Sequence, residues 1–123
     1  MAGIETDLVD TLEAVALAAG RVWPRTWPQD ATWPGLTYQL IADTPELALN
    51  RAVGSWRARF QVDCWALSTA DAVTLYGQVK AVLLAMTGAA VRIIGLGIED
   101  GADMPEPATE LIRRRLEVVI RYV

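Results

Sequence analysis

Histidine is absent from this 123-residue sequence, and cysteine occurs once, as Cys64. The lack of histidine excludes Ser-His-Asp and Cys-His catalytic arrangements and the usual zinc sites, and removes the side chain best suited to proton transfer near neutral pH. A lone cysteine cannot form a disulfide within the chain, which fits a reducing compartment. Catalysis would have to depend on carboxylates, Lys80, a tyrosine or a bound cofactor.

Long apolar runs and an excess of basic charge are also missing. No stretch approaches the roughly 18 consecutive apolar residues that a membrane-spanning helix needs. The chain begins with Glu5, Asp7 and Asp10 instead of the basic residues of a secretory signal. Its net charge of −4 disfavours a dedicated nucleic-acid binder, which usually carries a basic excess. We therefore expect synthesis in the cytoplasm and no membrane partner.

The residues that are present predict one globular domain over residues 1–123. Apolar residues make up 53% of the chain and charged residues 21%. A chain of this size buries roughly two-thirds of its unfolded surface, which is enough for a core without metal or disulfide support.

Two segments have apolar residues at helical spacing. The first covers residues 5–19 and ends at Gly20, and the second covers residues 69–86. Ser68 and Asp71 resemble a capping box at the start of the second helix.

Four segments have strand character, namely residues 36–42, 56–66, 91–98 and 110–122. The clearest is 56–66, where even positions are apolar and odd positions are polar except for Trp65, as in a strand with one solvated face. Its eleven residues span roughly 36 Å, about the diameter of a compact domain of this length, so its hairpin end is expected to project beyond the core. Residues 43–55 and 99–107 are expected to be loops.

This order of elements, helix, strand, strand, helix, strand, strand, predicts an α+β fold. We expect a two-layer sandwich in which a mostly antiparallel four-stranded sheet carries both helices on one face.

The connector from Arg21 to Gly35 contains three tryptophan-proline pairs. Proline disfavours helix in the residue before it and donates no backbone hydrogen bond, so the segment is extended or turning. Its three tryptophans either hold an irregular loop on the domain or contact another chain, since tryptophan is enriched at interface hot spots.

Two other patterns could suggest a ligand site, but neither fits one. Gly95-Leu96-Gly97 lacks the third glycine and the helix start of a dinucleotide loop, and the acidic residues that follow would repel phosphate. The acidic segment 99–106 matches no calcium-loop spacing. We expect no metal and no cofactor.

Arginines gather on the polar side of the two long strands. If these strands share a sheet, that side has five positive and two negative charges, a net of +3, and the rest of the −4 chain carries −7. Such a dipolar protein suits head-to-tail self-association, with the basic face against a neighbour's acidic loop; the alternative is a solvated face. Trp65 and Val119 on the same side favour a covered surface.

Several segments resemble one known family. They are Arg21-Val22-Trp23-Pro24, Gln29, Leu36-Thr37-Tyr38-Gln39, Arg57 to Ala66 with the pattern Arg-x-Gln-Val-Asp-x-Trp-Ala, and Arg113 to Tyr122. In these segments the chain is similar to the siphophage tail completion proteins, also called tail terminator or tail-to-head joining proteins, of phages, prophages and gene transfer agents.

The resemblance implies a structural virion protein and no enzyme. It implies a homo-oligomeric ring, commonly six-fold, that caps the tail tube protein and receives the head-tail connector or stopper protein. DNA would pass through the lumen without being read, and the protein, made in the cytoplasm of the bacterial host, would lie at the tail-head junction of the virion.

The candidate subunit and partner contacts are Arg51, Arg57, Arg59, Trp65, Arg113 and Arg115. One alternative is a nucleic-acid-contacting module that uses the arginine face and whose affinity falls steeply with salt. Another is a carboxylate-based or cofactor-dependent enzyme, for which no convergent site is present.

Overall fold

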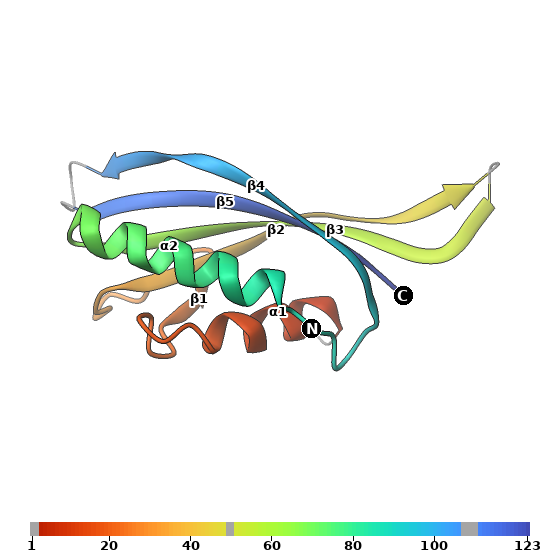
Figure 1. The fold of residues 1–123 in the computed structure, drawn as a ribbon, viewed down its shortest axis with the longest axis horizontal. Helices are drawn as coiled ribbons and strands as arrows, with labels where there is room; N and C mark the ends of the chain where they lie inside the picture. Colours follow the sequence, from red (N-terminus) through yellow and green to blue (C-terminus); the bar gives the residue numbers. More distant parts are fainter. Residues whose placement is uncertain (1–2, 49–50, 107–110) are drawn as a thin grey trace.

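The computed structural model describes residues 3–48, 51–106 and 111–123. Its elements are α1 (Ile4–Glu13), β1 (Val22–Pro24), β2 (Gly35–Ala48), β3 (Arg51–Ala66), α2 (Thr69–Leu84), β4 (Ile93–Glu106) and β5 (Leu111–Tyr122). The strands form one five-stranded sheet in the order β1-β2-β3-β5-β4. Both helices cover the same face of this sheet (Figure 1), which confirms the predicted α+β arrangement.

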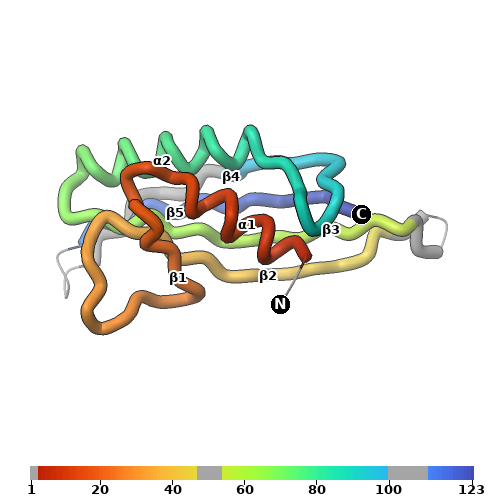
Figure 2. Tube along the Cα trace, turned by 90° about the horizontal axis from the view of Figure 1, so that it is seen from below, coloured from red at the N-terminus to blue at the C-terminus, as the bar shows by residue number. Residues whose placement is uncertain are grey.

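The core lies between the helices and the sheet. Apolar side chains at alternate positions of β3 and β5 meet the apolar stripes of the helices, and Phe60, Leu75, Leu116 and Ile120 are fully buried there. The two helices lie side by side over the sheet, with α2 above β3 and β5 and α1 toward β1 (Figure 2). In the described residues, no helix is long and apolar enough to cross a membrane.

The start of α2 follows the predicted cap. The Ser68 hydroxyl accepts the backbone N–H of Asp71 at 3.1 Å, which satisfies one of the free donors at the helix start. The helix then buries Ala72, Leu75, Tyr76, Val79 and Leu83 on one stripe, as the spacing predicts.

The prediction of four strands was wrong by one. β1 pairs in parallel with β2, so the sheet is mixed, while the other neighbouring strands are antiparallel. Strand β1 has three residues and ends in a proline, so it is too short to show an alternation of apolar and polar residues. Only its pairing with Leu36 to Tyr38 identifies it as a strand. Their edge position tolerates Pro24, because one side of an edge strand forms no ladder.

Helix α1 ends at Glu13, six residues before the predicted end. Ala14 and Val15 donate to carbonyls only three residues back, which tightens the chain into turns. The backbone N–H of Leu17 donates instead to the Gln78 side chain of α2 at 2.9 Å. The side chain of Gln78 on α2 therefore takes the backbone N–H that would have extended α1.

Residues 43–48 and 51–55 are strand, not the predicted loop. Here β2 and β3 continue as a paired hairpin arm, with register shifts between Leu40 and Ala42 and between Pro45 and Leu47 that accommodate the proline. The arm, yellow in Figure 1, extends past the helices, as the strand-length argument predicts.

The acidic segment is also strand instead of loop over residues 99–106. It pairs with Leu111 to Glu117 of β5, with a register shift between Asp100 and Asp103. Cross-strand hydrogen bonds override the weak strand propensity of its glycine and acidic residues. Residue 107 of the predicted loop lies outside the described residues.

Candidate interaction surface

The sheet face opposite the helices, here called the outward face, carries most of the predicted contact residues. The β3–β5 register places Arg57 opposite Arg121, Asp63 opposite Arg115, and Trp65 opposite Arg113. Arg59 lies between them on the same side of β3. Arg51 begins β3 in the hairpin arm, and its side chain lies outside the described part of the chain.

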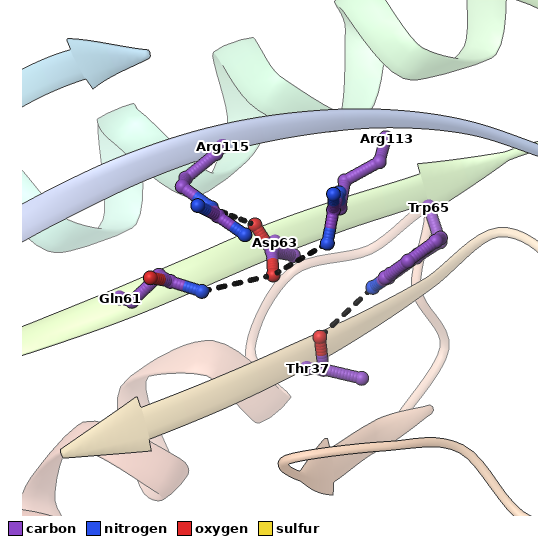
Figure 3. Close-up of polar contacts among 6 residues, drawn as sticks. All are labelled: Thr37, Gln61, Asp63, Trp65, Arg113 and Arg115. Carbon is purple, nitrogen blue, oxygen red and sulfur yellow. Dashed lines mark hydrogen bonds and ion pairs between the residues drawn. The ribbon is translucent and has the colours of Figure 1, made fainter. Parts of the chain in front are cut away.

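Asp63 organises one end of this face. Its side chain is 9% exposed, and its Oδ1 accepts from Nε of Arg115 at 3.0 Å. A second guanidinium, that of Arg113, lies 4.0 Å from Oδ2. The Gln61 amide lies within hydrogen-bond distance of both Asp63 and Arg115 (Figure 3). A single buried carboxylate therefore holds two of the candidate arginines.

Arg59 is held by carboxylates from two other strands. Its guanidinium lies 3.1 Å from both Glu99 of β4 and Glu117 of β5. The hydrogen bond with Glu99 and the charges of both carboxylates raise the pKa of Arg59. Because the pair with Glu99 is largely exposed, it contributes little to stability but aligns the three strands.

The hairpin arm supplies a further carboxylate. Glu46 accepts from Nε of Arg121 at 3.0 Å and from the Ser55 hydroxyl at 3.0 Å. These hydrogen bonds, that of Arg121 first, lower the pKa of Glu46.

The predicted charge of this face was too high. Glu46 and Glu99 were expected in loops, but both pair with arginines of the outward face. The described side chains of the face therefore hold five arginines against four carboxylates, a net of +1 instead of +3.

Arg57 differs from the other arginines of the face. It is exposed, and among the described residues no carboxylate comes within ion-pair distance of it, although it is near enough to Glu46 to help lower that pKa. Together with Arg121 it borders a hollow of about 340 Å³. The remaining lining residues are Leu96, Gly97, Ile98, Glu99 and Val119.

Trp65, the one apolar residue on the predicted solvated side of residues 56–66, is buried by its own chain. The residue is only 5% exposed, and its Nε1–H donates to the Thr37 hydroxyl at 2.8 Å (Figure 3). Trp27 packs edge-on against it, with ring centroids 4.3 Å apart. On another side, the Arg113 guanidinium lies 5.2 Å from the ring centroid.

The other two tryptophans of the connector extend this cluster. The ring centroid of Trp33 lies 5.0 Å from that of Trp27 and 5.8 Å from that of Trp23. The peptide bond between Trp33 and Pro34 is cis. The packing confirms that these rings hold the connector on the sheet. Because they remain half-buried, their contact with another chain stays a prediction.

A family model described as tail completion protein gp17 matches residues 6–123. No curated protein matches the chain.

Among solved structures, the fold is similar to a chain in the virion of a native gene transfer agent particle. The TM-score is 0.73 at 15% sequence identity, and the alignment covers 97% of this chain and 93% of that chain. A second solved chain aligns over 98% of this chain and 95% of its own length at 19% identity, but its TM-score of 0.46 is too low to support an argument.

Proposed function

The chain belongs to the tail completion protein gp17 family, and on that premise we propose that it forms a ring that ends a tail tube and joins it to a head. The family is one of structural tail proteins, so the chain is a structural component of a phage or gene transfer agent tail. The observation that carries the proposal is the family match over residues 6–123.

In the proposed assembly, six copies close the ring. One rim contacts the tail tube protein, and the other receives the head-tail connector or stopper protein, while DNA passes through the lumen unread. A closed ring needs two different complementary surfaces on each subunit. The outward face and the projecting hairpin arm are supporting features, because neither is covered by the helices (Figure 1).

The candidate contact residues divide into two groups in this proposal. Arg57 is free to contact a neighbour, and Arg51 would act from the hairpin arm. Arg59, Arg113 and Arg115 are tied to carboxylates of their own chain, so their part is to present a flat charged surface. Trp65 contributes by holding the connector on this face through its contact with Trp27.

The nucleic-acid alternative loses support from the same geometry. It depends on a basic excess, and the ion pairs with Glu46, Glu99, Glu117 and Asp63 remove most of that excess from the described face.

The proposal is tested in the source particle by removing the gene and supplying it again with an epitope tag. Particles without the protein should yield separate heads and tails, and gold-labelled antibody should mark the head-proximal end of complemented tails. Label along the tube or at the distal tip, or normal joining without the gene, would contradict the proposal.

The double charge reversal Arg57→Glu with Arg59→Glu should stop joining in the same complementation assay while the purified variant keeps its far-UV circular dichroism spectrum. Arg92→Glu, at an exposed position next to β4, is the matched control and should join normally.

A further inference from the structure

Arg57 and Arg121 form a like-charged pair directly across β3 and β5. Like charges in this position destabilise a sheet. Arg121 is compensated by Glu46 at 3.0 Å, but Arg57 has no such ion pair among the described residues. The fold therefore maintains an exposed cation that its own packing does not require.

The hollow beside Arg57 is suited to a mixed apolar and acidic occupant. Val119 supplies the apolar side chain of its lining, and the backbone around Gly97 completes it, because the side chains of Leu96 and Ile98 pack against the core on the other side of the sheet. The two arginines stand at its border, and Glu99, which also lines it, is paired with Arg59. A helix surface that carries small apolar residues and carboxylates would contact both the apolar lining and the arginines of this hollow.

The acidic segment 99–106 offers one described acidic side chain, and that one is not free to be the occupant. Its described side chain, Glu99, is already bound to Arg59 at 3.1 Å in the same subunit. Among the described side chains, the acidic partner for the head-to-tail pairing expected from the sequence therefore has to come from another element.

Helix α1 offers one. Glu5, Asp10 and Glu13 lie on its accessible side, and none of them forms an ion pair with a described cation. Thr6 and Val9 lie between these carboxylates and, with Tyr38, line a hollow of about 210 Å³. Arg25 lines the adjoining hollow with Glu5 but forms no ion pair with it.

The two surfaces lie on opposite sides of the molecule. The hollow at Arg57 is on the outward face over β3, β5 and β4, whereas α1 lies on the other face, toward β1 (Figure 2). Surfaces that are complementary and on opposite sides join subunits head to tail, which is the geometry that closes rings.

From this arrangement we infer that the hollow bordered by Arg57 and Arg121 receives the acidic side of α1 from a second copy of this chain. The inference rests on the proposed ring and specifies its subunit interface. Charge complementarity sets the order of subunits, and Val9 of the neighbour contacts Val119 in the hollow.

The test uses two variants with opposite defects. Arg57→Glu makes the outward face acidic, and the pair Asp10→Lys with Glu13→Lys makes α1 basic. Neither change should unfold the chain, because the first relieves the repulsion with Arg121 and the second places cations in the second half of a helix. Native mass spectrometry and negative-stain imaging at low salt give the readout, with and without tail tubes.

Each variant alone should associate about 100-fold more weakly than the unmodified protein, since like charges then meet at every interface. An equal mixture should form rings again, because alternating copies restore opposite charges at both kinds of junction. Arg92→Glu and Asp30→Lys, at exposed positions that line neither hollow, serve as matched controls and should form normal rings alone.

The outcomes are distinct. Rings from either charge-reversed variant alone, or a mixture that stays monomeric, would overturn this interface while the ring itself stands. Unmodified protein that stays monomeric even with tail tubes would contradict the ring and this interface together.

Discussion

Asp63 of β3 and Arg115 of β5 lie directly opposite each other on the outward face, with 3.0 Å between Oδ1 and Nε. The carboxylate is nearly buried, and the Arg113 guanidinium shares it. Since these two arginines are neutralised inside the chain, this end of the face serves stability. The other end, around Arg57, is the part of the face that we propose for recognition.

Asp63→Asn should lower the free energy of unfolding by about 1–3 kcal/mol, because two half-buried guanidinium groups lose their charged acceptor. Urea unfolding measures the change. A double-mutant cycle with Arg115→Met should show a coupling energy above about 0.5 kcal/mol. Additive effects of the two substitutions would mean that the observed pair contributes nothing to stability.

Trp65→Phe should cost about 1–3 kcal/mol, because the buried Thr37 hydroxyl loses its indole donor. The connector should also loosen, so trypsin should cleave faster after the exposed Arg25. Trp56→Phe is the control, since Trp56 is 41% exposed at the base of the arm. Equal stability and equal cleavage in the two variants would remove the supporting role given to Trp65.

Gly35→Ala should destabilise the protein by about 1–3 kcal/mol through overpacking. A Cβ at this position would lie 2.5 Å from Cζ3 of Trp23, so the ring must shift. The matched control is Gly77→Ala in α2, where nothing lies within 4 Å of the added carbon. That substitution should stabilise the helix by about 0.5–1 kcal/mol, and thermal melts of both variants should move in opposite directions.

Asp7 links α1 to the segment after α2 and predicts a loss of stability in acid. Burial raises the pKa of its carboxyl, but backbone N–H donors from Ala89, Ala90 and Val91 together lower it below the ordinary value of 3.8. A lowered pKa stabilises the fold above that ordinary value, and the contribution is lost as the pH falls through the folded pKa.

Asp7→Asn should therefore be less stable than the unmodified protein at pH 7, and the difference should narrow as the pH falls below about 4. Urea unfolding between pH 2.5 and pH 7 measures it. Asp10→Asn, at an exposed position of the same helix, should change little. A difference that stays constant over this range would show that the carboxylate charge is not what stabilises the contact.

The parts of the fold that the sequence predicts are those set by local periodicity. The alternation along Trp56 to Ala66 and along the final strand fixes which side chains face the helices, because burial at every second position is a property of one strand. The Ser68 cap and the stripe of α2 are likewise local. These elements already bring Arg57, Arg59 and Arg113 to one face.

The parts that sequence reasoning missed depend on distant residues. Pro45 and the acidic residues after Ile98 indicate a loop on their own, and only pairing with β3 and β5 makes them strand. One sequence signal could have placed Glu99 on the outward face. It follows Gly97 by two residues and Gly95 by four, so the three lie on the same side of a strand. The burial of Trp65 depends on rings from a connector more than 30 residues earlier.

Cryo-electron microscopy of the tail-head junction in the source particle tests the central claim most directly. The account predicts a closed ring of this chain there, with α1 of each subunit against the Arg57 hollow of the next. A junction without the protein, or subunits whose Arg57 side chains face solvent and touch no neighbouring copy, would contradict it.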